Sequence, residues 1–177
     1  SDPNTGEILA MGGKQIRERE DGSRYIVDYT PGIVTLPVTP GSIVKGASML
    51  VGYKYGAINI GDTVQDDCIK IKDTPEKCSW KKLGLIDDVD ALRMSSNYYQ
   101  YLIAIKIGNG TYNYNEALKI DTDAFKKYRD MYSSFGLGVK TGIDLPVESL
   151  GYTGKSILPG HLLDFAIGQY DTYTPIQ

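Results

Sequence analysis

The segment around Ser42 constrains the fold of this chain more than any other part of the sequence. Prolines and glycines crowd the residues that lead to it (TPGIVTLPVTPG), and they break any regular helix or strand there. From Ser42 onward, SIVKGASMLVGYKY carries apolar residues at helical spacing: Val44, Ala47, Met49, Leu50 and Tyr53. The change in pattern predicts a buried helix that begins at the serine.

The composition excludes some classes of protein. The chain has 177 residues, 41% of them hydrophobic and 23% charged, which is typical of one globular domain with its own core. Its formal net charge of -3 argues against a nucleic-acid partner, which usually requires a basic face. No apolar run is long enough to span a membrane. The chain begins at Ser1 without a start methionine, so we expect a targeting segment to lie outside it.

The remaining segments predict an α+β protein and not alternating βαβ units. We expect strands at 7–13, after a DPNTG turn, and at Arg24–Tyr29, with the Asp21-Gly22 turn favouring a hairpin. Residues 56–82 should form strands and loops, and TGIDLP a short turn and strand.

Three further helices are expected. Residues 87–108 should be helical in two pieces with a break at Ser95-Ser96-Asn97. Residues 122–138 form an amphipathic pattern, with Asp121 or Thr122 as the cap and Gly136 as the stop. PGHLLDFAIGQ indicates a last helical or buried segment, and YTPIQ the possible start of another helix.

Cys68 and Cys78 lie in a polar stretch on either side of a predicted turn at Thr74-Pro75. Two interpretations remain open at this point, a disulfide across a hairpin or two unpaired thiols. A structural zinc site is disfavoured, because two cysteines and the single histidine, His161, do not supply four ligands.

Ser42 and Lys45 form an S-x-x-K pattern, which is a candidate for nucleophilic catalysis. Residues three apart share a helix face, so the lysine amine can reach the serine hydroxyl. A serine needs a base to become a nucleophile, and a lysine can serve only if its pKa is lowered. The pattern alone is weak, because a serine N-cap with an exposed lysine is common. Ser79 and Lys82 match it too, but in a polar loop that contains the cysteines.

Ser95-Ser96-Asn97 is an S-x-N triplet at the predicted helix junction. A second serine can relay a proton to a leaving group, and an amide side chain can bind a substrate carbonyl. The alternative is a polar junction in which serine and asparagine only cap a helix.

Longer stretches give these patterns a context. DPNTGEILAM opens the chain, PGSIVKGASM contains Ser42, and SSN follows it. FGLGVKTGIDLPVES and AIGQYDTYTPIQ come next, in that order. Together they resemble the penicillin-binding protein family, in its high-molecular-mass, murein-crosslinking branch and more closely its monofunctional (class B) type.

The resemblance implies a serine-transpeptidase fold of the penicillin-binding and β-lactamase kind, α+β, with an antiparallel sheet and helices on both faces. Residues 1–177 would form a single, partial transpeptidase domain. The family's third motif, Lys-Ser/Thr-Gly, would lie beyond Gln177, since Lys140-Thr141-Gly142 belongs to the TGIDLP signature and precedes AIGQ.

The resemblance also assigns roles. It implies Ser42 as the acylated nucleophile, Lys45 as its general base, Ser95 as a proton relay and Asn97 as a substrate contact. The implied reaction is D,D-transpeptidation between peptidoglycan stem peptides that end in D-Ala-D-Ala, and β-lactam antibiotics would acylate the same serine. No metal or organic cofactor is implied.

The chain departs from the family pattern at a few positions. Ile43-Val44 replaces the commoner Thr-Phe pair and suits a buried face, while Val147 and Tyr170 stand where glycine is usual. These changes bear on substrate and drug preference and leave the expected fold unchanged.

Three alternatives share the fold: a β-lactam sensor, a non-catalytic scaffold for division or elongation complexes, and a hydrolase. The long signatures favour the transpeptidase over the sensor and the hydrolase. The family also implies the outer face of the bacterial plasma membrane, with an N-terminal anchor outside this sequence and division or elongation partners for the full-length protein.

For several residues of chemically reactive or ligand-binding type, we predict a structural role. His161 follows Pro159-Gly160 and is interpreted as a structural or capping residue. The tyrosines at 98, 99 and 101 are expected to pack rather than to bind sugars. Asp144 and Glu148 are a carboxylate pair in a turn signature and are also interpreted as structural.

Overall fold

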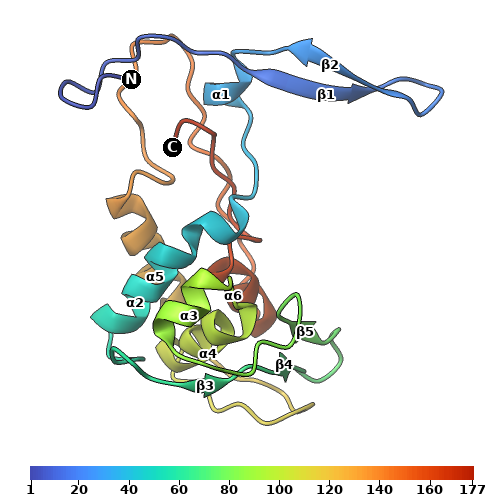
Figure 1. Cartoon of the computed structure of the whole chain (residues 1–177), viewed down its shortest axis with the longest axis vertical. Helices are drawn as coiled ribbons and strands as arrows, with labels where there is room; N and C mark the ends of the chain where they lie inside the picture. The colour runs from blue at the N-terminus through green and yellow to red at the C-terminus, as the bar shows by residue number, and fades with distance from the viewer.

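The computed structural model describes residues 1–177 and divides into two regions (Figure 1). Most of the helices, with several short strands, gather into a helical body at one end of the molecule. The N-terminal hairpin extends at the other end, and long irregular segments connect the two regions. None of the helices combines the length and the apolar character needed to cross a membrane.

The N-terminal hairpin confirms one strand prediction and corrects another. Strand β1 (Lys14–Glu18) pairs antiparallel with β2 (Arg24–Asp28), with Lys14 opposite Asp28. Gly22 has a φ of +80° in the connecting turn, a conformation that glycine adopts without strain. The strand predicted at 7–13 is wrong: those residues are irregular, and no segment of the chain forms a ladder with them. An apolar run becomes a strand only where a partner supplies hydrogen bonds.

The helices lie close to where the sequence placed them. The chain forms α1 (Gly32–Thr35), a 3₁₀ turn η1 (Gly41–Val44), α2 (Lys45–Lys54), α3 (Asp88–Arg93), α4 (Asn97–Ile107), α5 (Asp123–Ser134) and α6 (Pro159–Ala166). The break predicted at the S-x-N triplet separates α3 from α4. Helix α5 ends just before Gly136, whose φ is +92°. Of the two predicted caps of α5, the Thr122 side chain makes no capping hydrogen bond, whereas Asp121 Oδ1 accepts from Asp123 N at 3.0 Å.

The core is built around α4. Its residues are buried almost all round, as expected for a helix covered on every side, and it packs against α2 and α6. Tyr132 of α5 and Phe165 of α6 meet edge to face with ring centroids 5.1 Å apart. Tyr99 and Tyr101 are fully buried in this core. Their burial confirms the prediction that these tyrosines pack.

Residues 56–86 form two small strand pairs beside the helices. Strand β3 (Val64–Gln65) pairs with β6 (Leu85–Ile86), and β4 (Cys68–Ile69) with β5 (Lys77–Cys78), both antiparallel. The fold is thus α+β with antiparallel pairing, as predicted. The strands of residues 1–177 form three separate two-stranded sheets and no larger one.

Cys68 and Cys78 lie directly opposite each other in the β4–β5 pair and form a disulfide. Their Cα atoms are 4.3 Å apart, within the reach of one bridge. Of the two interpretations that the sequence left open, the structure therefore favours the bridge.

The C-terminal segments contain less regular structure than predicted. TGIDLP is irregular with two bends and forms no strand, and YTPIQ forms a single turn in which Gln177 N donates to Thr174 O at 3.0 Å. Both segments lie on irregular connections, where isolated bridges such as Tyr152 with Thr172 and Val38 with Tyr173 replace extended ladders. Prolines in both segments remove backbone donors, which favours turns over strands.

Candidate active site

Ser42 lies in the 3₁₀ turn that leads into α2, at the predicted start of the helix. The turn is held by backbone contacts with the end of α6, where Gly41 N donates to Gly168 O at 2.9 Å. A Cβ atom on Gly168 would lie only 2.2 Å from Gly41 O, so no side chain fits there. The position of the serine therefore depends on a glycine 126 positions later in the chain.

The two residues after Ser42 do not share one environment. Val44 is 3% exposed and belongs to the core, whereas Ile43 is 82% exposed. The expectation that both suit a buried face is wrong for Ile43. In a 3₁₀ turn successive side chains point about 120° apart, so one of two neighbours faces the solvent.

Lys45 contacts two of the other three predicted site residues, Ser95 and Asn97. Its side chain is buried, with the residue 3% exposed. The Nζ atom donates to Ser95 O at 2.8 Å, to Ser95 Oγ at 3.1 Å and to Asn97 Oδ1 at 2.6 Å. The ammonium group thus has three acceptors from the helix junction, which is the number that it can satisfy. The S-x-x-K and S-x-N patterns are thereby brought together across some 50 residues of sequence.

Ser42 itself is exposed, and its hydroxyl forms no hydrogen bond with Lys45. The contact predicted from i,i+3 spacing is therefore absent from this structure. The lysine turns instead toward the acceptors at 95 and 97, because a buried ammonium must be hydrogen-bonded.

Burial lowers the pKa of the Lys45 amine to about 8, while the nearby charge of Asp66 acts in the opposite direction. With that pKa, about a tenth of the amine is neutral at pH 7. An exposed lysine with the ordinary value of 10.5 would be neutral in only about three molecules in ten thousand. The environment of Lys45 therefore makes it far more capable of accepting a proton.

The junction between α3 and α4 orients the S-x-N triplet. Ser95 has a φ of +55°, unusual for a residue with a side chain, and Ser96 caps α4 by accepting from Tyr99 N at 3.0 Å. The Asn97 amide is held at both ends, since Nδ2 donates to Cys78 O at 3.0 Å while Oδ1 accepts from Lys45. The disulfide hairpin therefore forms one wall of the site.

Two residues that support this arrangement, Asp66 and Ser79, were not predicted as part of the site. The S-x-x-K match at Ser79 lies in a polar loop, a context that does not favour a nucleophile. In the structure its hydroxyl is buried and accepts from Asn97 N at 3.0 Å, and it donates to Asp66 Oδ2 at 2.8 Å. Nothing in the local pattern around either residue predicts these contacts, because the partners come from separate segments.

The other residues set aside in the sequence lie outside this cluster. Lys140-Thr141-Gly142 is exposed and irregular, and Thr141 N donates to Glu148 Oε1 at 2.7 Å. That contact agrees with a structural role for Glu148. His161 bonds Ser156 Oγ through Nδ1 at 2.6 Å and stacks on Tyr170, which agrees with its structural interpretation.

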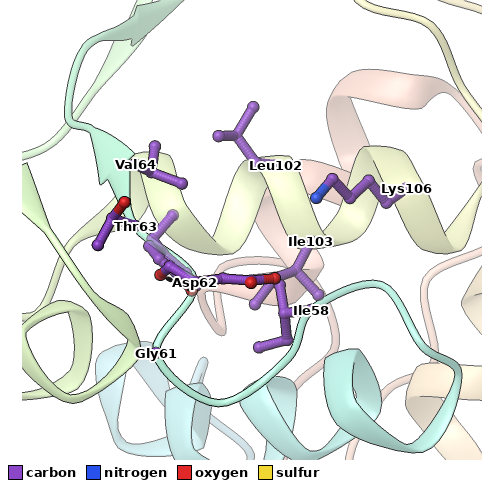
Figure 2. A pocket seen from close by; sticks show the side chains of 9 residues that line it. Ile58, Gly61, Asp62, Thr63, Val64, Leu102, Ile103 and Lys106 are labelled. Carbon is purple, nitrogen blue, oxygen red and sulfur yellow. Dashed lines mark hydrogen bonds between the residues drawn. The ribbon is translucent and has the colours of Figure 1, made fainter.

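A hollow of about 400 Å³ lies elsewhere on the helical body (Figure 2). Helix α4 contributes Leu102, Ile103 and Lys106 to it, and the loop before β3 contributes Ile58 and Asp62. None of the four predicted site residues lines this hollow. We place the candidate site at the junction of η1, α2 and α4, because there Lys45 is hydrogen-bonded to Ser95 and Asn97.

Comparison with known proteins gives the same family over the whole chain. Residues 1–177 match the family model described as the penicillin binding protein transpeptidase domain. The chain is 50% identical over 177 residues to penicillin-binding protein 2A of Bacillus subtilis (strain 168), covering 99% of this chain and 25% of that protein. It is 43% identical to penicillin-binding protein H of the same organism, with the same two shares. The chain thus spans about a quarter of the length of these relatives.

Solved structures show the same fold. Penicillin-binding protein 2B of Streptococcus pneumoniae (strain R6) superposes with a TM-score of 0.85 at 32% identity, covering 98% of this chain and 29% of that one. A complex of PBP2 with MreC from Helicobacter pylori gives a TM-score of 0.65 at 24% identity, covering 82% of this chain and 26% of that one. The second likeness concerns the fold alone.

Proposed function

This chain belongs to the transpeptidase domain family of penicillin-binding proteins, and from that membership we propose that it carries the nucleophile of a D,D-transpeptidase that cross-links peptidoglycan stem peptides. Ser42 is the acylated residue, Lys45 its general base, Ser95 a proton relay and Asn97 a substrate contact. One observation carries the proposal: the buried Lys45 amine, three residues after Ser42 in sequence, has a lowered pKa and donates hydrogen bonds to Ser95 and Asn97 of the S-x-N triplet.

The first half of the reaction is acylation. Neutral Lys45 takes the Ser42 hydroxyl proton while Oγ attacks the carbonyl carbon of the penultimate D-alanine. The C–N bond to the last D-alanine then breaks, and the departing nitrogen receives a proton from the Lys45 ammonium through the Ser95 hydroxyl. The 3.1 Å contact between Nζ and Ser95 Oγ supports this relay. The Ser42–Lys45 contact is expected to form when substrate is bound, since catalytic hydrogen bonds often tighten only then.

The second half transfers the acyl group. The amine of a neighbouring stem peptide attacks the ester carbonyl and loses a proton to Lys45, which is neutral after acylation. The C–O bond to Ser42 then breaks, and Lys45 returns that proton to Ser42 Oγ. A β-lactam enters the same first step, in which the ring amide C–N bond breaks. Its nitrogen stays tethered to the acyl group and obstructs the second attack.

Asn97 suits a substrate contact because its amide is fixed before substrate arrives. Lys45 and the Cys78 carbonyl hold the two ends of the amide, so little conformational entropy is lost on binding. If the Asn97 side chain rotated on binding substrate, Lys45 would lose one of its three hydrogen-bond acceptors. Substrate binding at Asn97 is therefore coupled to the hydrogen bonding of the general base.

For the protein that carries this chain we propose the outer face of the bacterial plasma membrane and a class B architecture with an N-terminal anchor. The relatives support this setting, including a peptidoglycan D,D-transpeptidase, MrdA, of Acinetobacter baumannii at 29% identity. Partners in an elongation or division complex are part of the proposal, in line with the PBP2–MreC complex among its structural neighbours.

The test is intact mass after incubation with a penicillin, on the polypeptide that carries this sequence in the cell. We expect one stable adduct, located on Ser42 by peptide mapping and absent from a folded Ser42→Ala variant. Release of cross-linked product from stem-peptide donor and amine acceptor then separates a transpeptidase from a sensor, which would acylate and stop. Rapid loss of the adduct would indicate a hydrolase, and no adduct on the folded wild-type protein would leave only the scaffold alternative.

A further inference from the structure

Asp66 is a buried carboxylate without a cationic partner. It lies between β3 and β4, is 6% exposed, and forms no ion pair with any lysine, arginine or histidine of the chain. A buried charge is costly unless hydrogen bonds compensate it. The hydrogen-bond donors that compensate the charge therefore indicate the structural role of Asp66.

Two serine hydroxyls provide the compensation. Ser79 Oγ donates to Asp66 Oδ2 at 2.8 Å, and Ser96 Oγ donates to the same oxygen at 2.7 Å. Both hydroxyls are themselves buried. Because each donates its only proton to the carboxylate, the lone pairs of each are free to accept.

The same hydroxyls accept from the first turn of α4. Ser79 Oγ accepts from the backbone N–H groups of Asn97 at 3.0 Å and Tyr98 at 3.3 Å, and Ser96 Oγ accepts from Tyr99 N at 3.0 Å. Three N–H groups that a helix leaves without partners are thus satisfied through two hydroxyls that depend on one carboxylate. A negative charge at this end also suits the helix dipole.

We propose that Asp66 is a positioning residue for the acylation step, and that through Ser79 and Ser96 it fixes the start of α4 so that Ser95 and Asn97 present their acceptors to Lys45. The inference rests on the proposed function and deepens it. The cluster explains why Ser79, which matched S-x-x-K in the sequence, is buried: its hydroxyl links a carboxylate to the Asn97 backbone and does not act as a nucleophile.

The charge of Asp66 has a second consequence at Lys45. Burial lowers the pKa of that amine, and Asp66 is the charged group whose field opposes the change. The other charged groups on the helices packed against α2 have partners of their own. Asp88 of α3 accepts from Tyr53, and Lys106 of α4 donates to Ala57 O. The remaining charges of α3 and α5 form ion pairs: Arg93 with Asp90, Lys126 with Asp130, Lys127 with Asp123 and Arg129 with Asp171. Removing the Asp66 charge should therefore lower the pKa of Lys45 further.

Two substitutions separate the roles of charge and of hydrogen bonding. Asp66→Asn removes the charge but leaves an oxygen that can accept from both hydroxyls. Ser79→Ala keeps the charge and removes the acceptor for the Asn97 backbone. Asp67→Asn is the matched control, because this neighbouring aspartate is exposed and forms no side-chain hydrogen bond with the cluster.

The measurement is the second-order rate constant for acylation of Ser42 by a penicillin, recorded from about pH 5.5 to 9. Thermal unfolding verifies that each variant is folded. We expect Asp66→Asn to shift the midpoint of the pH profile to lower pH by about half a unit or more. Ser79→Ala should lower the rate about tenfold with the midpoint in place, and Asp67→Asn should change neither.

An unmoved midpoint in Asp66→Asn, or a wild-type rate in Ser79→Ala, would overturn the role of Asp66 while acylation of the wild type continued. Failure of the wild-type protein to form any adduct would instead overturn the proposed function, so the two failures are distinguishable. Should Asp66→Asn not fold, the Ser79→Ala rate decides the question alone, since that variant retains the carboxylate and its Ser96 partner.

Discussion

Gly168 should control the position of the nucleophile, although it lies far from Ser42 in sequence. Its φ is +77°, and a Cβ atom would meet Gly41 O at 2.2 Å and Gly41 N at 2.7 Å, both backbone atoms that cannot turn aside. Gly168→Ala therefore forces the Ser42 turn away from α6 and breaks the 2.9 Å hydrogen bond from Gly41 N.

The expected cost follows from three contributions. An alanine in the left-handed region costs about 1 to 2 kcal/mol. The steric shift adds about 1 to 3 kcal/mol, and the lost hydrogen bond adds about 1 kcal/mol. We expect unfolding in denaturant to report a total loss of about 4 kcal/mol. Acylation of Ser42 should fall about 10- to 100-fold, since displacement of a reacting group by about 1 Å has that effect.

Gly22→Ala is the matched control. Gly22 has nearly the same φ, +80°, but no atom lies within 4 Å of its Cβ position in the hairpin turn. It should cost only the backbone strain, about 1 to 2 kcal/mol, and leave acylation unchanged. Equal losses of stability and of acylation rate in the two variants would refute the argument, because backbone strain alone would then account for Gly168.

Two further predictions concern the base and the wall of the site. Acylation should rise about tenfold per pH unit below the Lys45 pKa of about 8 and level off above it, since only the neutral amine accepts a proton; a profile that is flat from pH 6 to 8 would exclude Lys45 as the base. Replacing Cys68 and Cys78 together by serine should lower stability by about 3 kcal/mol, the closure entropy of a loop with a sequence separation of 10. Acylation should also weaken, because the Cys78 carbonyl that holds Asn97 becomes mobile; denaturant unfolding and penicillin labelling of the double variant measure both effects, and unchanged labelling would show that Asn97 does not need the bridge.

The sequence by itself located most local structure and the family. Helical periodicity placed α2 and α5, and the Asp21-Gly22 turn placed the turn and the second strand of the first hairpin, because these signals lie within a few residues of one another. The long signatures identified the family, which the match over residues 1–177 confirms. Patterns of this kind fail where a strand needs a distant partner, and the irregular backbone at 7–13 is the example.

Only the tertiary structure decided the contacts of the candidate site. The sequence proposed Ser42, Lys45, Ser95 and Asn97 but paired the lysine with the serine three residues before it. The fold instead turns the amine toward the helix junction, because a buried ammonium binds whatever acceptors the packing of α2 on α4 places beside it.

Asp66 and Ser79, which support the site, also could not be identified from the sequence. Asp66 and Ser79 carry no local signal, since each is a polar residue in a polar loop, and their value arises from burial against the first turn of α4. Side-chain period and turn chemistry are properties of neighbours in sequence, whereas burial and hydrogen-bond partners are properties of neighbours in space. The sequence could therefore determine which residues are suited to the chemistry, and packing alone determined which of them meet.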